Sequence, residues 1–168
     1  MMILAFDTHY FNNSAKTVGL SFQDWDAENA LQIKTEILKD IAPYEPGFFY
    51  RRELPCILSL LSKFHLENVT CIVVDGYCIL DNSGKHGLGG HLYEALERQI
   101  PIIGVAKTRF RANTLNVLEL LRGKSEKPLF ISSIGMELQE AYQNIQMMHG
   151  AYRIPTLLQA LDQETKNH

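Results

Sequence analysis

The change of hydrophobic period along the chain is the feature that most restricts its fold. Three apolar stretches, residues 3–6, 15–22 and 31–38, come first, and short polar turns separate them. Such short connections are typical of an antiparallel meander. From residue 54 onward, apolar residues at helical spacing alternate with short β-branched runs. The pattern therefore predicts an α/β protein with a mixed sheet.

The alternation predicts the element order β-β-β-α-β-α-β-α-β-α-α. We expect helices over residues 54–64, 88–96, 115–121 and 138–145, and a short last helix over 155–162. The later strands are expected over 70–74, 102–106 and 129–132. Strands joined through a helix return by a crossover, so these strands should be parallel, with helices on both faces of the sheet. No repeat or linker divides the chain, and its 168 residues predict a single domain over residues 1–168.

Composition excludes several protein classes. With 46% apolar and 21% charged residues, the chain is close to an average globular domain and unlike a disordered one. It has no apolar run of membrane-spanning length and no basic leader, so neither membrane insertion nor export is expected. Its three cysteines, Cys56, Cys71 and Cys78, form no C-x-x-C pair and favour a reducing cytoplasm. The net charge of −3 leaves room only for a local basic patch if nucleic acid is the partner.

Two aspartates, Asp7 and Asp75, follow apolar strands and are expected to end them. If those strands are neighbours, the two carboxylates converge, which is costly unless a cation compensates their charge. Mg²⁺ takes one or two protein carboxylates and keeps waters or phosphate oxygens as its other ligands. The pair therefore indicates a magnesium site, although aspartate at a strand end is also a common turn former or helix cap.

Two further charged residues are candidates for the same chemistry. Glu53 begins a predicted helix directly after Arg51 and Arg52, where the helix dipole stabilises a carboxylate. Lys107 follows the strand 102–106, and a lysine leaving the carboxyl end of a parallel strand can contact a phosphate. The alternatives are a first-turn acid and a solvated lysine.

The segment 75–91 contains five glycines and lets backbone N–H groups approach an anion or a flat base. It matches neither a Walker A sequence nor a G-x-G-x-x-G turn after a strand, which disfavours nucleotide-triphosphate and NAD chemistry. His86 and His91 are five residues apart, not the four of a helical ligand pair, so ordinary polar or capping roles are favoured.

Prolines on both sides of Tyr44 mark the segment from Pro43 to Tyr50. Their fixed φ angles predict a stiff loop that presents the Tyr44 ring outward. Proteins that act on a base within nucleic acid often insert such a side chain into the base stack. The alternative is a connector whose Phe48 and Phe49 belong to the core.

Six segments together carry a resemblance to a known family: A-F-D-T at Asp7, P-Y-E-P-G-F-F-Y-R-R-E ending at Glu53, V-V-D-G at Asp75, G-L-G-G-H-L from Gly87, I-P-I-I-G-V-A-K ending at Lys107, and G-A-Y-R-I-P ending at Pro155. The chain resembles the endonuclease V family. Members are metal-dependent nucleases with a ribonuclease H-like fold that recognise deaminated purine, mainly inosine, in DNA or RNA. The resemblance therefore implies a ribonuclease H-like fold, a nucleic-acid partner, and neither a membrane nor an obligate protein partner.

The resemblance also implies roles for particular residues. It places Mg²⁺, with Mn²⁺ as a substitute, on Asp7, Glu53 and Asp75. The same three acids would be catalytic together with Lys107 and Asp162, which lies seven residues after Pro155. A strand-separating wedge is implied at Pro43, Tyr44, Glu45 and Pro46, and a base pocket at Gly47, Gly76, Ile79, Gly87 and Leu88.

The chain departs from the family pattern near this pocket. Tyr77 and Asp81 occupy positions where the family carries histidine, and the segment after Lys107 is expected to shorten to a single helix. These departures keep two alternatives open: a non-catalytic nucleic-acid-binding homologue, and a nuclease for a different modified or structured substrate. Retention of every acidic position favours an active endonuclease.

Overall fold

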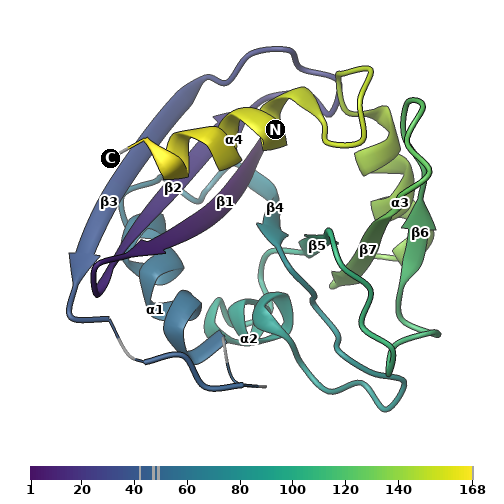
Figure 1. The fold of residues 1–168 in the computed structure, drawn as a ribbon. Coiled ribbons are helices and arrows are strands. Elements are labelled where there is room, and N and C mark those ends of the chain that lie inside the picture. The colour runs from purple at the N-terminus through teal and green to yellow at the C-terminus, as the bar shows by residue number, and fades with distance from the viewer. Residues whose placement is uncertain (42, 47, 49, 168) are drawn as a thin grey trace.

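The computed structural model describes residues 1–41, 43–46, 48 and 50–167. Within these residues the chain forms a seven-stranded sheet in the order β3-β2-β1-β4-β5-β7-β6 (Figure 1). The strands are β1 (Met2–Phe11), β2 (Ser14–Phe22), β3 (Gln32–Lys39), β4 (Val69–Asp75), β5 (Ile102–Ala106), β6 (Leu118–Leu120) and β7 (Leu129–Ile134). The helices are α1 (Tyr50–Leu61), α2 (Leu88–Ala95), α3 (Leu138–Met147) and α4 (Thr156–Lys166).

Strand pairing confirms the mixed sheet. The first three strands form the predicted meander, since β1 pairs antiparallel with β2, and β2 pairs antiparallel with β3. The pairs β1–β4 and β4–β5 are parallel, as expected for strands joined through α1 and α2. The centre of the sheet is therefore parallel, and its carboxyl ends open toward one edge.

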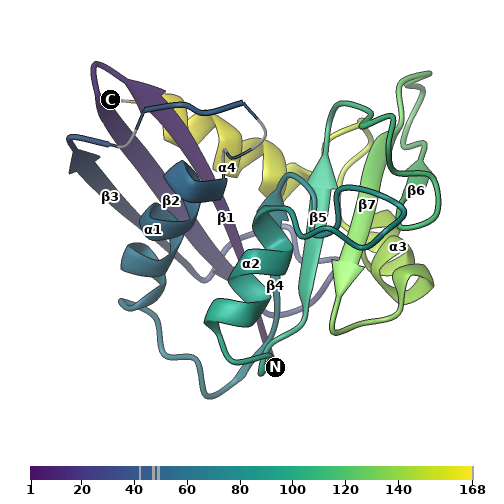
Figure 2. The same cartoon turned by 90° about the horizontal axis from the view of Figure 1, so that it is seen from below.

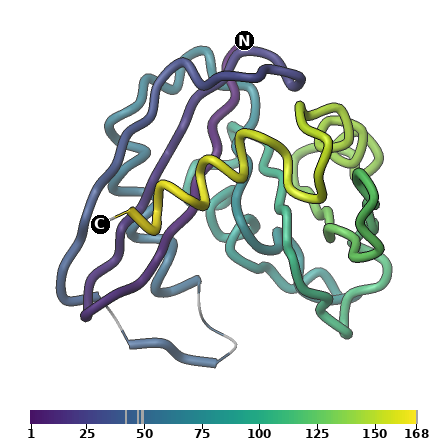
Figure 3. The backbone as a smooth tube through the Cα atoms, turned by 45° about the horizontal axis from the view of Figure 1, so that its top comes forward, coloured from purple at the N-terminus to yellow at the C-terminus, as the bar shows by residue number. Residues whose placement is uncertain are grey.

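Helices cover both faces of the sheet, as predicted. α1 and α2 pack against one face, where Ile57 and Leu92 meet Leu4 and Ile72 in one core cluster (Figure 2). α3 and α4 pack against the other face, and α4 crosses β1 and β2 (Figure 3). The strands between these layers read as nearly continuous apolar runs because both of their faces are buried.

The predicted helix over residues 115–121 is wrong. The leucines there suggested helical spacing, but Leu115 is 72% exposed and Leu120 is fully buried. Leu118–Leu120 instead forms the edge strand β6, which pairs antiparallel with β7. A short edge strand buries one residue in two, so its pattern over three residues cannot be distinguished from a helical turn.

Two consequences follow from this error. Since no helix connects β5 to β7, the two strands run antiparallel and not parallel as predicted. The segment after Lys107 contains a strand and is not a single helix.

Two expected element ends are also wrong. Asp7 does not end its strand, because β1 continues beyond it to Phe11 and pairs with β2 throughout. The last helix extends past Asp162 to Lys166.

Candidate active site

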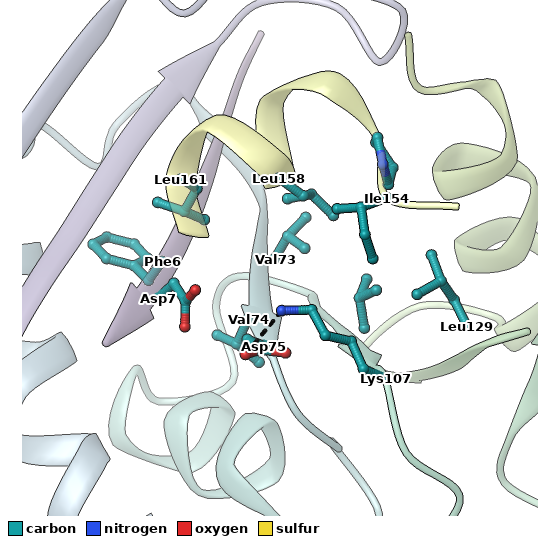
Figure 4. Close-up of a pocket in the computed structure, with 12 residues that line it drawn as sticks. Phe6, Asp7, Val73, Val74, Asp75, Lys107, Leu129, Ile154, Leu158 and Leu161 are labelled. Carbon is teal, nitrogen blue, oxygen red and sulfur yellow. Dashed lines mark ion pairs between the residues drawn. The ribbon is translucent and has the colours of Figure 1, made fainter. Parts of the chain in front are cut away.

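Strand register brings Asp7 and Asp75 to the same edge of the sheet. β1 and β4 are parallel neighbours with Phe6 opposite Val74, so the two aspartates follow directly on adjacent strands. Asp75 lies opposite Val105 of β5, and Lys107 is the first residue after that strand. Figure 4 shows both carboxylates and the Lys107 ammonium group at one place.

Lys107 connects this strand edge to α4. Its Nζ lies 3.9 Å from Asp75 Oδ2 and 3.6 Å from Asp162 Oδ1. The other oxygen of Asp162 accepts a hydrogen bond from Lys166 Nζ at 3.1 Å. Asp162 therefore approaches Asp75 from the last helix, with one lysine on each side of its carboxylate.

Glu53 approaches from the first turn of α1 on the opposite face of the sheet. Its pKa is raised to about 8, first because the carboxylate is buried and then because Asp75 and Asp7 repel its charge. Burial and the charge of Asp75 likewise raise the pKa of Asp7 to about 8. Glu53 thus belongs to the same electrostatic cluster as the two aspartates, although it comes from a helix and not from a strand.

The other two acids of the cluster are compensated to different degrees. Burial raises the pKa of Asp75, against the opposing charge of Lys107. Burial acts in the same direction on Asp162, but the hydrogen bond from Lys166 and the charges of both lysines outweigh it and lower the pKa of Asp162. Asp162 is therefore the acid of the group that holds its charge most readily.

A small apolar cavity lies beside the two partly buried aspartates. It measures about 30 Å³ and lies against Asp7, Asp75 and Lys107, with apolar walls that include Phe6 from β1 and Leu158 from α4 (Figure 4). Apolar walls provide few dipoles to stabilise a carboxylate, so its protonated form is favoured.

The donor set fits a hard divalent cation. The charge of Asp75 raises the pKa values of both Asp7 and Glu53, and a cation between the carboxylates would remove that cost of ionisation. Within the described residues, no group of three or more His, Cys, Asp or Glu side chains is arranged so that it could hold a metal ion by itself. Mg²⁺ does not require such a group, since one or two carboxylates with waters and substrate oxygens are enough.

A groove of about 750 Å³ opens onto the acidic cluster. Glu53 and Asp75 line it, with Gly76 and Lys107. Its walls carry Tyr44 on one side and the cationic side chains of Lys85 and Arg109, together with Tyr77, Asp81 and Phe110, from the segments after β4 and β5. The groove therefore places aromatic rings and positive charges around the carboxylates, as a nucleic-acid strand would require.

The four residues of the implied wedge, Pro43, Tyr44, Glu45 and Pro46, are all described in the structure. The ring of Tyr44 is 60% exposed, as the stiff-loop interpretation expects. Glu45 pairs with Arg51 of α1 at 3.3 Å, which ties the loop to the helix. Gly47, which was assigned to the base pocket, lies outside the described residues.

The remaining members of the implied base pocket separate into two groups. Gly76 lines the groove with a φ of +133°, a backbone conformation that favours glycine. Ile79, Gly87 and Leu88 do not line it. The Gly87 N–H donates to the Cys78 carbonyl and the Leu88 side chain is buried in the core, so the 87–88 turn packs against the β4–α2 loop in this structure.

The sequence alone did not predict the structural roles of Tyr77 and Asp81, the two residues that depart from the family pattern. The Tyr77 hydroxyl donates to the Thr108 carbonyl at 2.6 Å and accepts from the Phe110 N–H at 3.1 Å, which fixes the loop after Lys107. The Asp81 carboxylate accepts bonds from the N–H groups of Ser83 and Lys85 within its own turn. The D-N-S-G run around Asp81 is a turn signal that could have indicated this role.

The sequence profile of the Endonuclease V family matches residues 1–163. The chain belongs to the endonuclease V family. Solved structures of this family share its fold. Endonuclease V from Ciona intestinalis is 17% identical, with a TM-score of 0.78, and the match covers 98% of this chain and 84% of that one. It was solved in complex with DNA that contains an inosine followed by a ribo-adenosine.

Two further family structures are similar to this chain over almost its whole length. Human endonuclease V is 23% identical, with a TM-score of 0.75 and coverage of 99% and 83% of the two chains. The enzyme from Streptomyces avermitilis is 24% identical, with a TM-score of 0.77 and coverage of 99% and 80%. A comparison with curated protein sequences finds no match. These neighbours establish that this family member has the ribonuclease H-like fold that the resemblance implied.

Proposed function

We propose that this endonuclease V family member is a divalent-metal-dependent endonuclease that hydrolyses a phosphodiester near a deaminated purine, inosine, in nucleic acid. The convergence of Asp7 and Asp75 beside Lys107, at a groove that Glu53 lines and an exposed tyrosine borders, carries this proposal. Family membership supports the reaction class. The inosine-containing DNA bound by the Ciona protein supports the substrate class.

In this mechanism Asp7 and Asp75 would hold Mg²⁺ from adjacent strands, and Glu53 would complete the ligand set from α1. When bound, the ion supplies an activated water and stabilises charge on the leaving 3′-oxygen. All three carboxylates must be ionised for this role, so binding of the ion and loss of their protons are coupled.

The other polar residues act directly on the substrate. Lys107 reaches both Asp75 and Asp162 through one flexible side chain, so its ammonium group can contact a phosphate oxygen without leaving the site. There it would neutralise the charge that develops on the phosphate in the transition state. Asp162, which keeps its charge, is placed to orient a water by accepting a hydrogen bond.

Tyr44 provides the means of exposing the base. Its ring stands free at the rim of the groove, on a loop between two prolines. Insertion of such a ring into a base stack costs little conformational entropy because the loop is already restricted. The extruded base would then lie in the groove near Gly76.

The test is cleavage of labelled oligonucleotides with one inosine, as single-stranded DNA, duplex DNA and RNA, with Mg²⁺, Mn²⁺ or a chelator. We expect inosine-specific cleavage that requires the metal and is lost in Asp75→Asn. Asp26→Asn, an exposed aspartate in the β2–β3 connection, is the matched control and should cleave normally.

Two other results would replace the proposal. Tight metal-independent binding without cleavage would identify a non-catalytic homologue. Cleavage that ignores inosine would identify a nuclease for a different substrate. Normal cleavage by Asp75→Asn would remove the assigned site.

A further inference from the structure

Tyr44 borders two cavities. One is the groove with the acidic cluster. The other, here called the rear pocket, measures about 320 Å³, and its lining includes Tyr10, Asn12, Asn13, Ser14, Tyr44 and Arg52. This volume is within the range of small-molecule sites, about 300–1,000 Å³. A ring that separates two cavities can divide two groups that were stacked on each other.

The first turn of α1 contributes a lining residue to each of the two cavities. Arg52 and Glu53 are consecutive residues of this helix, so their side chains diverge by about 100° around its axis. Glu53 lines the groove and Arg52 lines the rear pocket. One helical turn therefore presents an acid to the reaction side of Tyr44 and a guanidinium group to the other side.

Arg52 stacks on tyrosine rings that line the rear pocket. Its guanidinium carbon lies 3.4 Å from the centre of the Tyr10 ring and 5.9 Å from that of Tyr44. Its Nε is buried and has no hydrogen-bond partner among the described residues. Nucleobases stack on tyrosine rings and on guanidinium planes, and the described residues that line this pocket include no acid to repel a nucleotide.

The turn between β1 and β2 adds polar groups that could contact a base edge. Asn12 and Asn13 form the two-residue turn between β1 and β2, with φ angles of +45° and +60°. Their side chains are exposed. An asparagine amide carries both donors and an acceptor, and can therefore pair with the polar edge of any base. The pocket thus combines stacking surfaces with hydrogen-bonding groups and a positive charge.

We propose that the rear pocket binds a second, unpaired nucleobase, the one that Tyr44 separates from the base in the groove. This inference rests on the proposed function, because it assigns Tyr44 to the substrate. The base comes either from the neighbouring position of the cut strand or from the position opposite inosine on the complementary strand. Both sources present the same chemistry to the pocket.

The test is a coupling experiment between the pocket and individual bases of the substrate. The probes are oligodeoxynucleotides with one deoxyinosine in which an abasic spacer replaces each neighbouring base in turn, or the opposite base of a duplex. Binding is measured in Ca²⁺, and cleavage in Mg²⁺. For the wild type, we expect one spacer position to weaken binding at least fivefold, since one stacked base is lost.

The pocket variants are Asn12→Gly and Asn13→Gly, which tolerate the positive φ angles, and Arg52→Lys, which keeps the charge but removes the planar group. We expect them to bind the intact probe several-fold more weakly and to lose sensitivity to that one spacer. Asn29→Gly, an exposed asparagine in the β2–β3 connection, is the matched control and should keep the wild-type sensitivity. Melting temperatures verify that each variant is folded.

The position of the sensitive spacer identifies the source of the base. Sensitivity within single-stranded probes indicates the cut strand, and sensitivity only in duplex probes indicates the complementary strand. Equal spacer effects in the wild type and in folded pocket variants would overturn the proposal that the rear pocket binds a base. The proposed inosine-specific cleavage would not be affected by that result. A wild type that neither binds nor cleaves any inosine probe would instead overturn the proposed function.

Discussion

Burial and repulsion from neighbouring carboxylates control the protonation of Asp7 and Glu53 more than ion pairing does. Asp7 and Glu53 each have a pKa raised to about 8, from ordinary values of 3.8 and 4.5. The one lysine within ion-pair distance of Asp75 is shared with Asp162. Ionisation of these carboxylates is therefore unfavourable at neutral pH, and a bound cation would make it favourable.

The raised pKa values of Asp7 and Glu53 predict that the metal-free protein loses stability as pH rises. Between about pH 4 and pH 8 the folded state keeps protons on Asp7 and Glu53 that the unfolded chain has already released, so the free energy of unfolding falls with increasing pH. Urea denaturation in a chelator should therefore give a higher midpoint at about pH 6.5 than at about pH 8.5.

Asp7→Asn is the control for this pH dependence, because it removes one raised carboxyl and part of the repulsion on Glu53. We expect the urea midpoint of Asp7→Asn to vary less with pH than that of the wild type. Addition of Mg²⁺ to the wild-type protein should raise its midpoint at the higher pH. A wild-type midpoint that is equal at both pH values, or higher at pH 8.5, would contradict the assigned cause.

The sequence predicts part of this residue-level arrangement. The sequence makes the convergence of Asp7 and Asp75 conditional on neighbouring strands, and β1 and β4 are neighbours, although Asp7 lies within β1 and does not end it. Lys166 was not anticipated, although its i, i+4 spacing from Asp162 is a visible helical pair signal. The signal was overlooked because the last helix was expected to end at Asp162.

At the level of elements, Tyr77 holds the loop that carries Lys107 and Arg109. Tyr77→Phe removes only the hydroxyl that connects Thr108 and Phe110, leaving a carbonyl and an N–H unpaired. We expect a loss of about 1 kcal/mol in the free energy of unfolding and several-fold weaker binding of an inosine oligonucleotide. Tyr142→Phe, on α3 against the other core, is the control and should leave binding unchanged. Unchanged binding by Tyr77→Phe would show that the loop does not need this bond.

The centre of the sheet depends on the absence of a side chain at Gly104. A Cβ at this position would lie 2.5 Å from the Gly76 carbonyl oxygen and 2.6 Å from Ser132 Oγ. The oxygen belongs to the backbone next to Asp75, so the strain would move the acid itself. Gly104→Ala should cost about 1–3 kcal/mol and sharply reduce cleavage.

Gly84→Ala separates backbone strain from this steric effect. Gly84 has a φ of +93°, but a Cβ there meets no atom within 4 Å. We expect Gly84→Ala to lower the melting temperature while cleavage continues at the wild-type rate. Loss of cleavage in Gly84→Ala, or its retention in Gly104→Ala, would contradict the assigned role of close packing behind Asp75.

Element prediction succeeded where the hydrophobic pattern was long and failed where it was short. The meander and the strands β4 and β5 have four or more consecutive apolar or alternating residues, which fixes their type. β6 has three residues, and the misassignment there also reversed the direction expected for β7. Direction is a property of the connection, so one wrong element changes the topology of the next.

At the scale of the whole molecule, charge is distributed unevenly. The chain has a net charge of −3, and none of its helices in the described ranges is long and apolar enough to span a bilayer. Three cationic side chains, those of Lys85, Lys107 and Arg109, nevertheless line the groove. A polyanion should therefore bind this protein through few, local contacts, with the rest of the surface contributing little.

This distribution predicts a modest salt dependence of nucleic-acid binding. Three phosphate contacts on a single strand release enough counterions for a slope of about −2 in a plot of log affinity against log salt concentration. The measurement is fluorescence anisotropy of a single-stranded inosine oligonucleotide in Ca²⁺ over a range of KCl concentrations. Lys85→Gln and Arg109→Gln should each reduce the slope by about 0.7.

Arg98→Gln is the matched control, because Arg98 is an exposed cation paired with Glu94 on α2 and does not line the groove. Its slope should equal that of the wild type. A slope near zero would show that phosphates do not enter the groove. An equal reduction in all three variants would contradict local contact in the groove, because a cation that does not line the groove would then contribute as much as those that do.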